Sequence, residues 1–154
     1  MSEYTTPQLV ADFAESEGLP WPSDAAERLQ AITRATRYLD RLPWRGVRSS
    51  GRFQDRAWPR DGVRDSEGHP IGPAEIPREV VEAANRLAVA EAQDPGFLSP
   101  TVSADQMLVQ ETIGPMSFTY RMPTGPADYR STLLAVSELL RDLVKGQSYD
   151  LHRA

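Results

Sequence analysis

Cysteine is absent from this chain of 154 residues, histidine occurs only at positions 69 and 152, and the one lysine is Lys145. Without cysteine there is no disulfide, no thiol nucleophile and no zinc site that depends on sulfur ligands. Two histidines leave little from which to build a metal site or a general base. The sequence therefore predicts a protein that holds no cofactor and no metal and is not an enzyme.

Long hydrophobic runs and known catalytic motifs are missing as well. No apolar stretch approaches the ~20 residues of a membrane span. The N-terminal MSEYTTPQLV lacks a basic region followed by a hydrophobic one, so we expect neither a signal peptide nor a membrane partner. The sequence contains no phosphate loop, no GxSxG, no HExxH and no EF-hand pattern. Its length suits one soluble domain with a proper core.

What the chain does have is an uneven distribution of charge. The formal net charge is -5, made up of -5 in residues 1–30, +6 in residues 31–64 and -6 in residues 65–154. Arginine supplies all but one of the basic residues and suits bidentate pairing with carboxylate or phosphate. The basic segment could pair with the acidic flanks, within the chain or between neighbouring copies, or it could contact nucleic acid. We favour pairing, because overall acidity argues against a dedicated nucleic-acid binder.

Local signals predict helices over four parts of the chain. Thr6 followed by Pro7 is typical of a helix start, and Gly18 of a helix end. Asp24 or Ser23 caps a second helix over 24–42, with apolar residues at helical spacing. A third helix begins at Pro77, and a last one runs from Asp128 to Lys145. The apolar residues expected on the second helix are Leu29, Ile32, Leu39 and Leu42.

The remaining segments predict a long loop and one pair of strands. Residues 44–76 are rich in arginine, glycine and proline and keep no periodicity, which predicts a loop without secondary structure; such loops are usually functional or ordered by a partner. Residues 107–120 alternate around Gly114-Pro115, as in a β-hairpin. The expected fold is mainly α, a small bundle of about four helices with a long Arg-rich loop and a short hairpin. We expect one domain over 1–146 and a C-terminal docking tail over 147–154.

The loop brings together aromatic and basic side chains that could bind a partner. They could stack and clamp single-stranded DNA. Alternatively, Trp44 and Trp58 pack the loop onto the helices while the arginines bridge subunits. We favour the second interpretation. The expected subunit-interface residues are Trp44, Arg45, Arg48, Arg52, Arg56, Trp58 and Arg60, and Phe53 belongs to the same aromatic and basic group.

Four blocks of sequence resemble a known family in the same order. They are ITRATRYLDRLPWRGVR, AWPRDGVRDSEGHPI, EIPREVVEAANRLAVAE and VQETIGPMSFTY. Together they are similar to the head-tail adaptor (head completion, or connector) proteins of tailed phages, some members of which are labelled DnaT-like single-stranded-DNA-binding proteins. The resemblance covers residues 25–145. The N-terminal residues 1–22 differ from the family pattern, so the resemblance gives them no role.

The resemblance implies a structural virion protein at the head-tail junction of a phage, or of a phage-like particle such as a gene transfer agent. It implies a homo-oligomeric ring of about twelve copies that is made in the bacterial cytoplasm and bound beneath the portal protein. Such a ring continues the channel for double-stranded DNA, without binding it tightly, and presents a surface to the downstream stopper or tail connector. By the same resemblance the tail grips the portal. The implied portal-binding residues are Gln147, Ser148, Tyr149, Asp150, Leu151, His152, Arg153 and Ala154.

Overall fold

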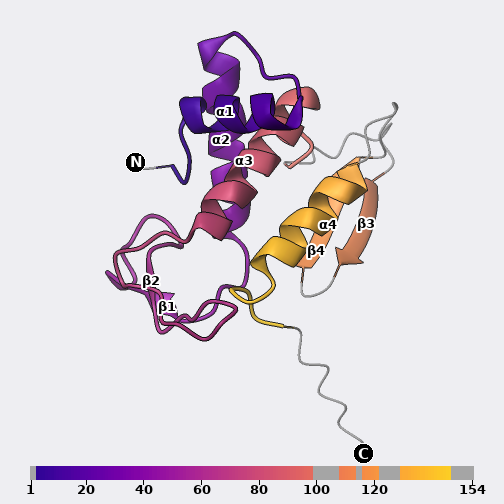
Figure 1. The fold of residues 1–154 in the computed structure, drawn as a ribbon. Helices are drawn as coiled ribbons and strands as arrows, with labels where there is room; N and C mark the ends of the chain where they lie inside the picture. The colour runs from indigo at the N-terminus through magenta and orange to yellow at the C-terminus, as the bar shows by residue number, and fades with distance from the viewer. Residues whose placement is uncertain (1–2, 99–107, 114–115, 122–128, 147–154) are drawn as a thin grey trace, which may run out of the picture.

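Four helices and two small antiparallel strand pairs make up the fold in a computed structural model, which describes residues 3–98, 108–113, 116–121 and 129–146 (Figure 1). This confirms the mainly α prediction. Within the described residues, no helix is both long enough and apolar enough to cross a membrane. The helices are α1 (Pro7–Glu17), α2 (Ala25–Asp40), α3 (Arg78–Gln93) and α4 (Tyr129–Leu140). The strands are β1 (Val47–Arg48), β2 (Arg60–Asp61), β3 (Leu108–Ile113) and β4 (Met116–Arg121).

Helix α3 is the centre of the core, because it contacts each of the other three helices. Its buried side chains are mostly small, as the alanine-rich sequence predicts, so neighbouring helices can approach closely. Val80 and Leu87 add larger apolar side chains with no exposed surface. From α4, Leu133, Val136 and Leu140 pack into the same core. Much of the apolar surface of α4 is therefore buried within this chain.

The residues predicted to start and end helices are found at helix ends in the structure. The hydroxyl of Thr6 accepts a hydrogen bond from the backbone N–H of Leu9 at 3.3 Å. The carboxylate of Asp24 does the same for the N–H of Glu27 at 3.1 Å. Gly18 ends α1 with a φ of 66°, in the left-handed region that glycine adopts without strain. The hairpin also agrees with the prediction, since β3 pairs with β4 from Leu108↔Arg121 to Ile113↔Met116.

One expectation about the helices is wrong. Helix α4 ends at Leu140, not at Lys145. Residues 141–143 form a turn that leads the chain to the segment after α2, where the backbone N–H of Lys145 donates to the carbonyl of Pro43 at 2.8 Å. Leu29 lies on α2 as expected, but 54% of it is exposed.

Residues 44–76 form a loop, as predicted, but this loop is compact and contains one short strand pair that was not expected; it is called here the loop lobe. Strands β1 and β2 pair through Val47↔Asp61 and Arg48↔Arg60. Inside the lobe, the amide nitrogen of Gln54 donates to the carbonyls of Arg56 and Pro59, both at 2.9 Å. Polar side chains thus bond to backbone groups that lie outside the helices and strands. Periodicity cannot reveal this kind of order.

One glycine of the lobe has no possible replacement. Gly46 has a φ of 68°, and a Cβ at this position would lie 2.3 Å from the carbonyl oxygen of Asp61. The backbone at Gly46, just before β1, therefore lies so close to β2 that only glycine fits there.

Candidate functional site

The N-terminal residues tie the loop lobe to the helical bundle. The Tyr4 hydroxyl donates to the carboxylate of Asp40 at the end of α2, and it accepts from the backbone N–H of Trp58 at 3.1 Å. The hydroxyl of Thr5 donates to the side-chain oxygen of Asn85 on α3 at 2.5 Å. Residues 3–5 thus connect α2, α3 and the lobe, which gives the N-terminus the role that the sequence left open.

The two lobe tryptophans are buried. Trp44 is 3% and Trp58 is 1% exposed, and their rings meet edge to face with centroids 5.5 Å apart. The indole N–H of Trp44 donates to the carbonyl of Leu39 at 2.8 Å. This confirms the interpretation that both rings pack the lobe onto the helices. Neither ring is available to stack on a nucleic-acid base.

Three of the five lobe arginines in the expected interface use their guanidinium groups within the chain. Arg56 pairs with Glu3 and with Asp40, each at 3.1 Å. Arg60 donates to the backbone carbonyls of Arg45, Gly46 and Ala57 at 2.7 to 3.0 Å. Arg45 donates from Nε to the carbonyl of Val144 at 3.1 Å. These three side chains stabilise the lobe, so their guanidinium groups already have partners within the chain.

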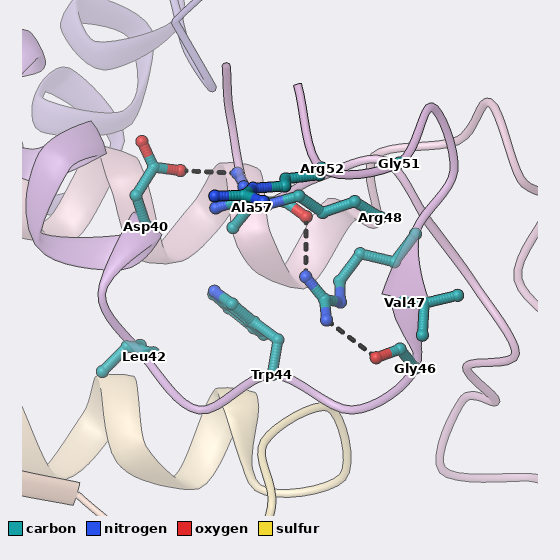
Figure 2. A pocket seen from close by; sticks show the side chains of 10 residues that line it. Asp40, Leu42, Trp44, Gly46, Val47, Arg48, Gly51, Arg52 and Ala57 are labelled. Atoms are coloured by element: carbon teal, nitrogen blue, oxygen red, sulfur yellow. Dashed lines mark hydrogen bonds between the residues drawn. The ribbon is translucent and has the colours of Figure 1, made fainter. Parts of the chain in front are cut away.

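Arg48 and Arg52 differ, because neither side chain has a hydrogen bond or ion pair to any residue in the described part of the chain. Both line a hollow of about 440 Å³ with Trp44, Arg60 and Asp40. Figure 2 shows both side chains reaching toward the end of the hollow where Asp40 lies. We call this space the arginine hollow.

The charge of the arginine hollow is positive and largely uncompensated. Asp40 is the one acid in its lining, and its oxygens already accept from Tyr4, Arg56 and the backbone N–H of Ala57. Burial, and then the nearby charge of Arg48, lower the pKa of Arg60 from its ordinary value. Like charges therefore crowd one another here, and an incoming anion would relieve that repulsion.

Two apolar side chains next to these arginines in the sequence are exposed to solvent. Phe53 is 92% exposed, and Val47, which lines the hollow, is 66% exposed. Apolar side chains that are exposed together and bordered by charged ones can mark an interaction surface. We call Val47, Arg48, Arg52 and Phe53 together the basic surface.

We expect Tyr4→Phe to lower the free energy of unfolding by about 1–3 kcal/mol at pH 7, because the buried N–H of Trp58 loses its acceptor. Burial, with the hydrogen bond to Asp40, raises the pKa of Tyr4 above its ordinary value of 10.0. The unfolded chain therefore releases this proton at a lower pH than the folded one. The stabilisation is present below pH 10 and is lost as the pH rises above it. Urea unfolding at pH 7 and pH 11 measures both effects, and an equal alkaline loss in wild type and variant would contradict this role.

The other predicted site residues carry less information. The portal-binding tail, residues 147–154, lies outside the described residues, and so does His152. His69 is exposed in a turn, with Nδ1 3.5 Å from the carboxylate of Asp65, as expected for a solvated histidine. Among the residues that the structure describes, no group of three or more histidines and acids is placed to hold a metal ion.

Sequence reasoning missed the residues that organise the site. Tyr4, Asp40, Gln54 and Gly46 position the lobe, and Val47 was not expected to be exposed. The only sequence signal for Asp40 was its place in the block RATRYLD, because its partners Tyr4 and Arg56 are 36 and 16 positions away. Contacts over such distances leave no mark in local periodicity.

The comparisons with known proteins point to one family. A family model described as "Putative DnaT-like ssDNA binding protein" matches residues 2–154, nearly the whole chain. No curated protein and no solved structure matches it.

Proposed function

The chain belongs to this DnaT-like family, and we propose that it is a non-enzymatic structural subunit of a phage or phage-like particle, because its four sequence blocks resemble head-tail adaptors. It forms a ring beneath the portal, continues the DNA channel and joins the capsid vertex to the next connector. Its partners are copies of itself, the portal and the downstream stopper or tail protein. Double-stranded DNA passes through without tight binding.

The observation that carries this proposal is the exposed tip of an otherwise well-bonded lobe. Val47, which precedes Arg48, and Phe53, which follows Arg52, are both exposed, while the buried tryptophans and the bonds of Gln54 and Arg60 hold the backbone in place. An apolar anchor flanked by arginines is the composition that protein interfaces favour. A contact surface that is ordered before binding loses little entropy when a partner arrives.

The net acidity of the chain also suits this role. A channel through which a genome slides must not bind phosphate groups tightly, and exposed carboxylates repel them. The basic charge is meanwhile concentrated in one segment, residues 31–64. Complementary patches of this kind are what neighbouring copies need in a head-to-tail ring.

Deletion of residues 147–154 tests the portal contact. We expect the shortened chain to stay folded, because its last core contacts, Leu143 and Val144, and the bond from Lys145 to Pro43 all precede the cut. Association with purified portal protein should be lost, as measured by co-sedimentation. The full chain, alone and with portal, is the control, and its mass gives the copy number. Unchanged co-sedimentation of the shortened chain would count against the proposal.

Single-stranded-DNA binding is the second candidate, favoured by the description of the family. Phe53 with Arg48 and Arg52 could hold one base and its phosphates. With Trp44 and Trp58 buried, however, Phe53 is the one exposed ring left in the aromatic and basic group of the lobe.

A salt titration with a single-stranded oligonucleotide separates the two functions. We expect no binding at ~100 mM salt, for wild type and for Phe53→Ala alike. Micromolar binding with a steep salt dependence, weakened about tenfold or more by Phe53→Ala, would favour the DNA function, because loss of one stacked base has that cost.

A further inference from the structure

The exposed apolar side chains gather in the two segments of opposite charge. Of the six large hydrophobic residues exposed in the described part of the chain, three lie in the acidic residues 1–30 and two in the basic residues 31–64. The acidic three are Leu9, Leu19 and Leu29; the basic two are Val47 and Phe53. Each segment thus exposes both apolar and charged side chains to solvent.

On α1 these groups form one outward face. Leu9, Asp12 and Ser16 follow one another at helical spacing, opposite the buried Val10 and Ala14, and Leu19 continues beyond the helix end. Glu15 is exposed beside them and has no ion pair with any described residue. Asp12 accepts a hydrogen bond from Gln8 at 2.7 Å, which leaves its charge uncompensated. We call Leu9, Asp12, Glu15 and Leu19 the acidic surface.

The acidic surface supplies what the arginine hollow lacks. The hollow holds the unpaired Arg48 and Arg52 and has no free carboxylate, while exposed Val47 lies in its lining and exposed Phe53 follows Arg52 in the chain. A carboxylate entering it would gain charge-assisted hydrogen bonds from planar guanidinium groups. Leu9 of α1 and Leu19 beyond its end would cover Val47 and Phe53.

The two surfaces do not meet within one molecule, because no ion pair joins Asp12 or Glu15 to Arg48 or Arg52. Figure 1 shows α1 lying across the upper part of the helical bundle and the loop lobe with β1 and β2 below it. Residues 3–5 are bonded to the lobe and to α3 and hold the start of α1 in that position. Two different patches at separate places on the surface produce a head-to-tail contact, which continues from copy to copy and closes into a ring when the rotation permits.

We propose that the acidic surface of one copy binds in the arginine hollow of the next, with the carboxylates of Asp12 and Glu15 facing Arg48 and Arg52. This names the partner of the basic surface and rests on the proposed ring. The chemical class of the ligand is a protein carboxylate, and the occupant is a second copy of this chain.

Mixing two charge-reversed variants tests the contact. The variant Arg48→Glu/Arg52→Glu keeps an intact acidic surface, and Asp12→Arg/Glu15→Arg keeps an intact basic surface. Each alone should associate with itself at least about tenfold more weakly than wild type. Their mixture should regain association as alternating copies in a 1:1 ratio, because one contact is the native pair of surfaces and the next is the same pair with its charges exchanged. Sedimentation equilibrium measures all three samples, and Arg78→Glu/Arg141→Glu, which makes the same charge change at exposed positions elsewhere, should associate as wild type does.

Three results would overturn the inference. One is a mixture that stays monomeric while wild type associates. Another is a wild-type protein that does not self-associate at ~1 mM, either alone or in the presence of portal protein. The third is an Arg48→Glu/Arg52→Glu variant that loses oligonucleotide binding but keeps wild-type self-association, since the hollow would then bind phosphate. The portal experiment with the shortened tail is independent of all three, so failure of the ring contact and failure of the adaptor role are distinguishable.

Discussion

Trp58→Ala is expected to reduce the free energy of unfolding by about 3–5 kcal/mol, the usual cost of removing a fully buried aromatic side chain. Trp58 is 1% exposed and contacts Trp44 edge to face, so the change leaves a cavity where the lobe meets the helices. Urea unfolding followed by circular dichroism measures the loss. Because Trp58 also positions the backbone that accepts from Arg60, the variant should in addition lose association through the basic surface.

Phe53→Ala is the matched control for this change. It removes an aromatic side chain from the same lobe, but one that is 92% exposed. Its free energy of unfolding should stay within about 0.5 kcal/mol of wild type, as for most surface substitutions. If Trp58→Ala were equally harmless to stability, the ring would not be a core residue and the stacking interpretation of the lobe would be favoured instead.

Glu91→Ala should be as destabilising, by about 3–5 kcal/mol, because a buried charged network loses its acceptor. Glu91 is 1% exposed near the end of α3. Its Oε1 accepts from Arg34 at 2.9 Å and from the backbone N–H of Gly96 at 2.8 Å, and its Oε2 accepts from the N–H of Leu98 at 2.8 Å. Without the carboxylate, the turn after α3 keeps two N–H groups with no partner.

Glu82→Ala is the control for the loss of a glutamate from the same helix. Glu82 pairs with Arg86 one turn away at 2.9 Å, in partial contact with solvent, and such pairs contribute about 0.3–0.5 kcal/mol. Urea unfolding at pH 7 compares the two variants, with Glu91→Gln as an intermediate that keeps one carbonyl acceptor. A Glu91→Ala variant as stable as Glu82→Ala would contradict the role given to the buried carboxylate.

The difference between these glutamates illustrates what sequence reasoning can reach. Helical spacing already separates them, because Glu91 continues the apolar stripe of Ala84 and Leu87 whereas Glu82 lies on the opposite face of α3. The partners of Glu91 come from the turn that folds back over the helix end and from Arg34 of α2. Those contacts do not follow from the spacing of residues along α3, so the sequence placed Glu91 on the buried face but did not show what its carboxylate bonds to.

The sequence alone determined the helices, the hairpin and the segregation of charge, because caps, prolines, glycines and periodicity act between neighbours in the chain. It also placed the aromatic and basic residues of the site in one segment. Only the tertiary structure decided which of those residues are free. Contacts with residues as far as 99 positions away hold Trp44, Trp58, Arg45, Arg56 and Arg60. In contrast, Arg48, Arg52 and Phe53 remain exposed or unpaired. Whether a side chain is bonded within the molecule or free to bind a partner depends on contacts between distant parts of the chain. Such contacts form only when the core brings those parts together.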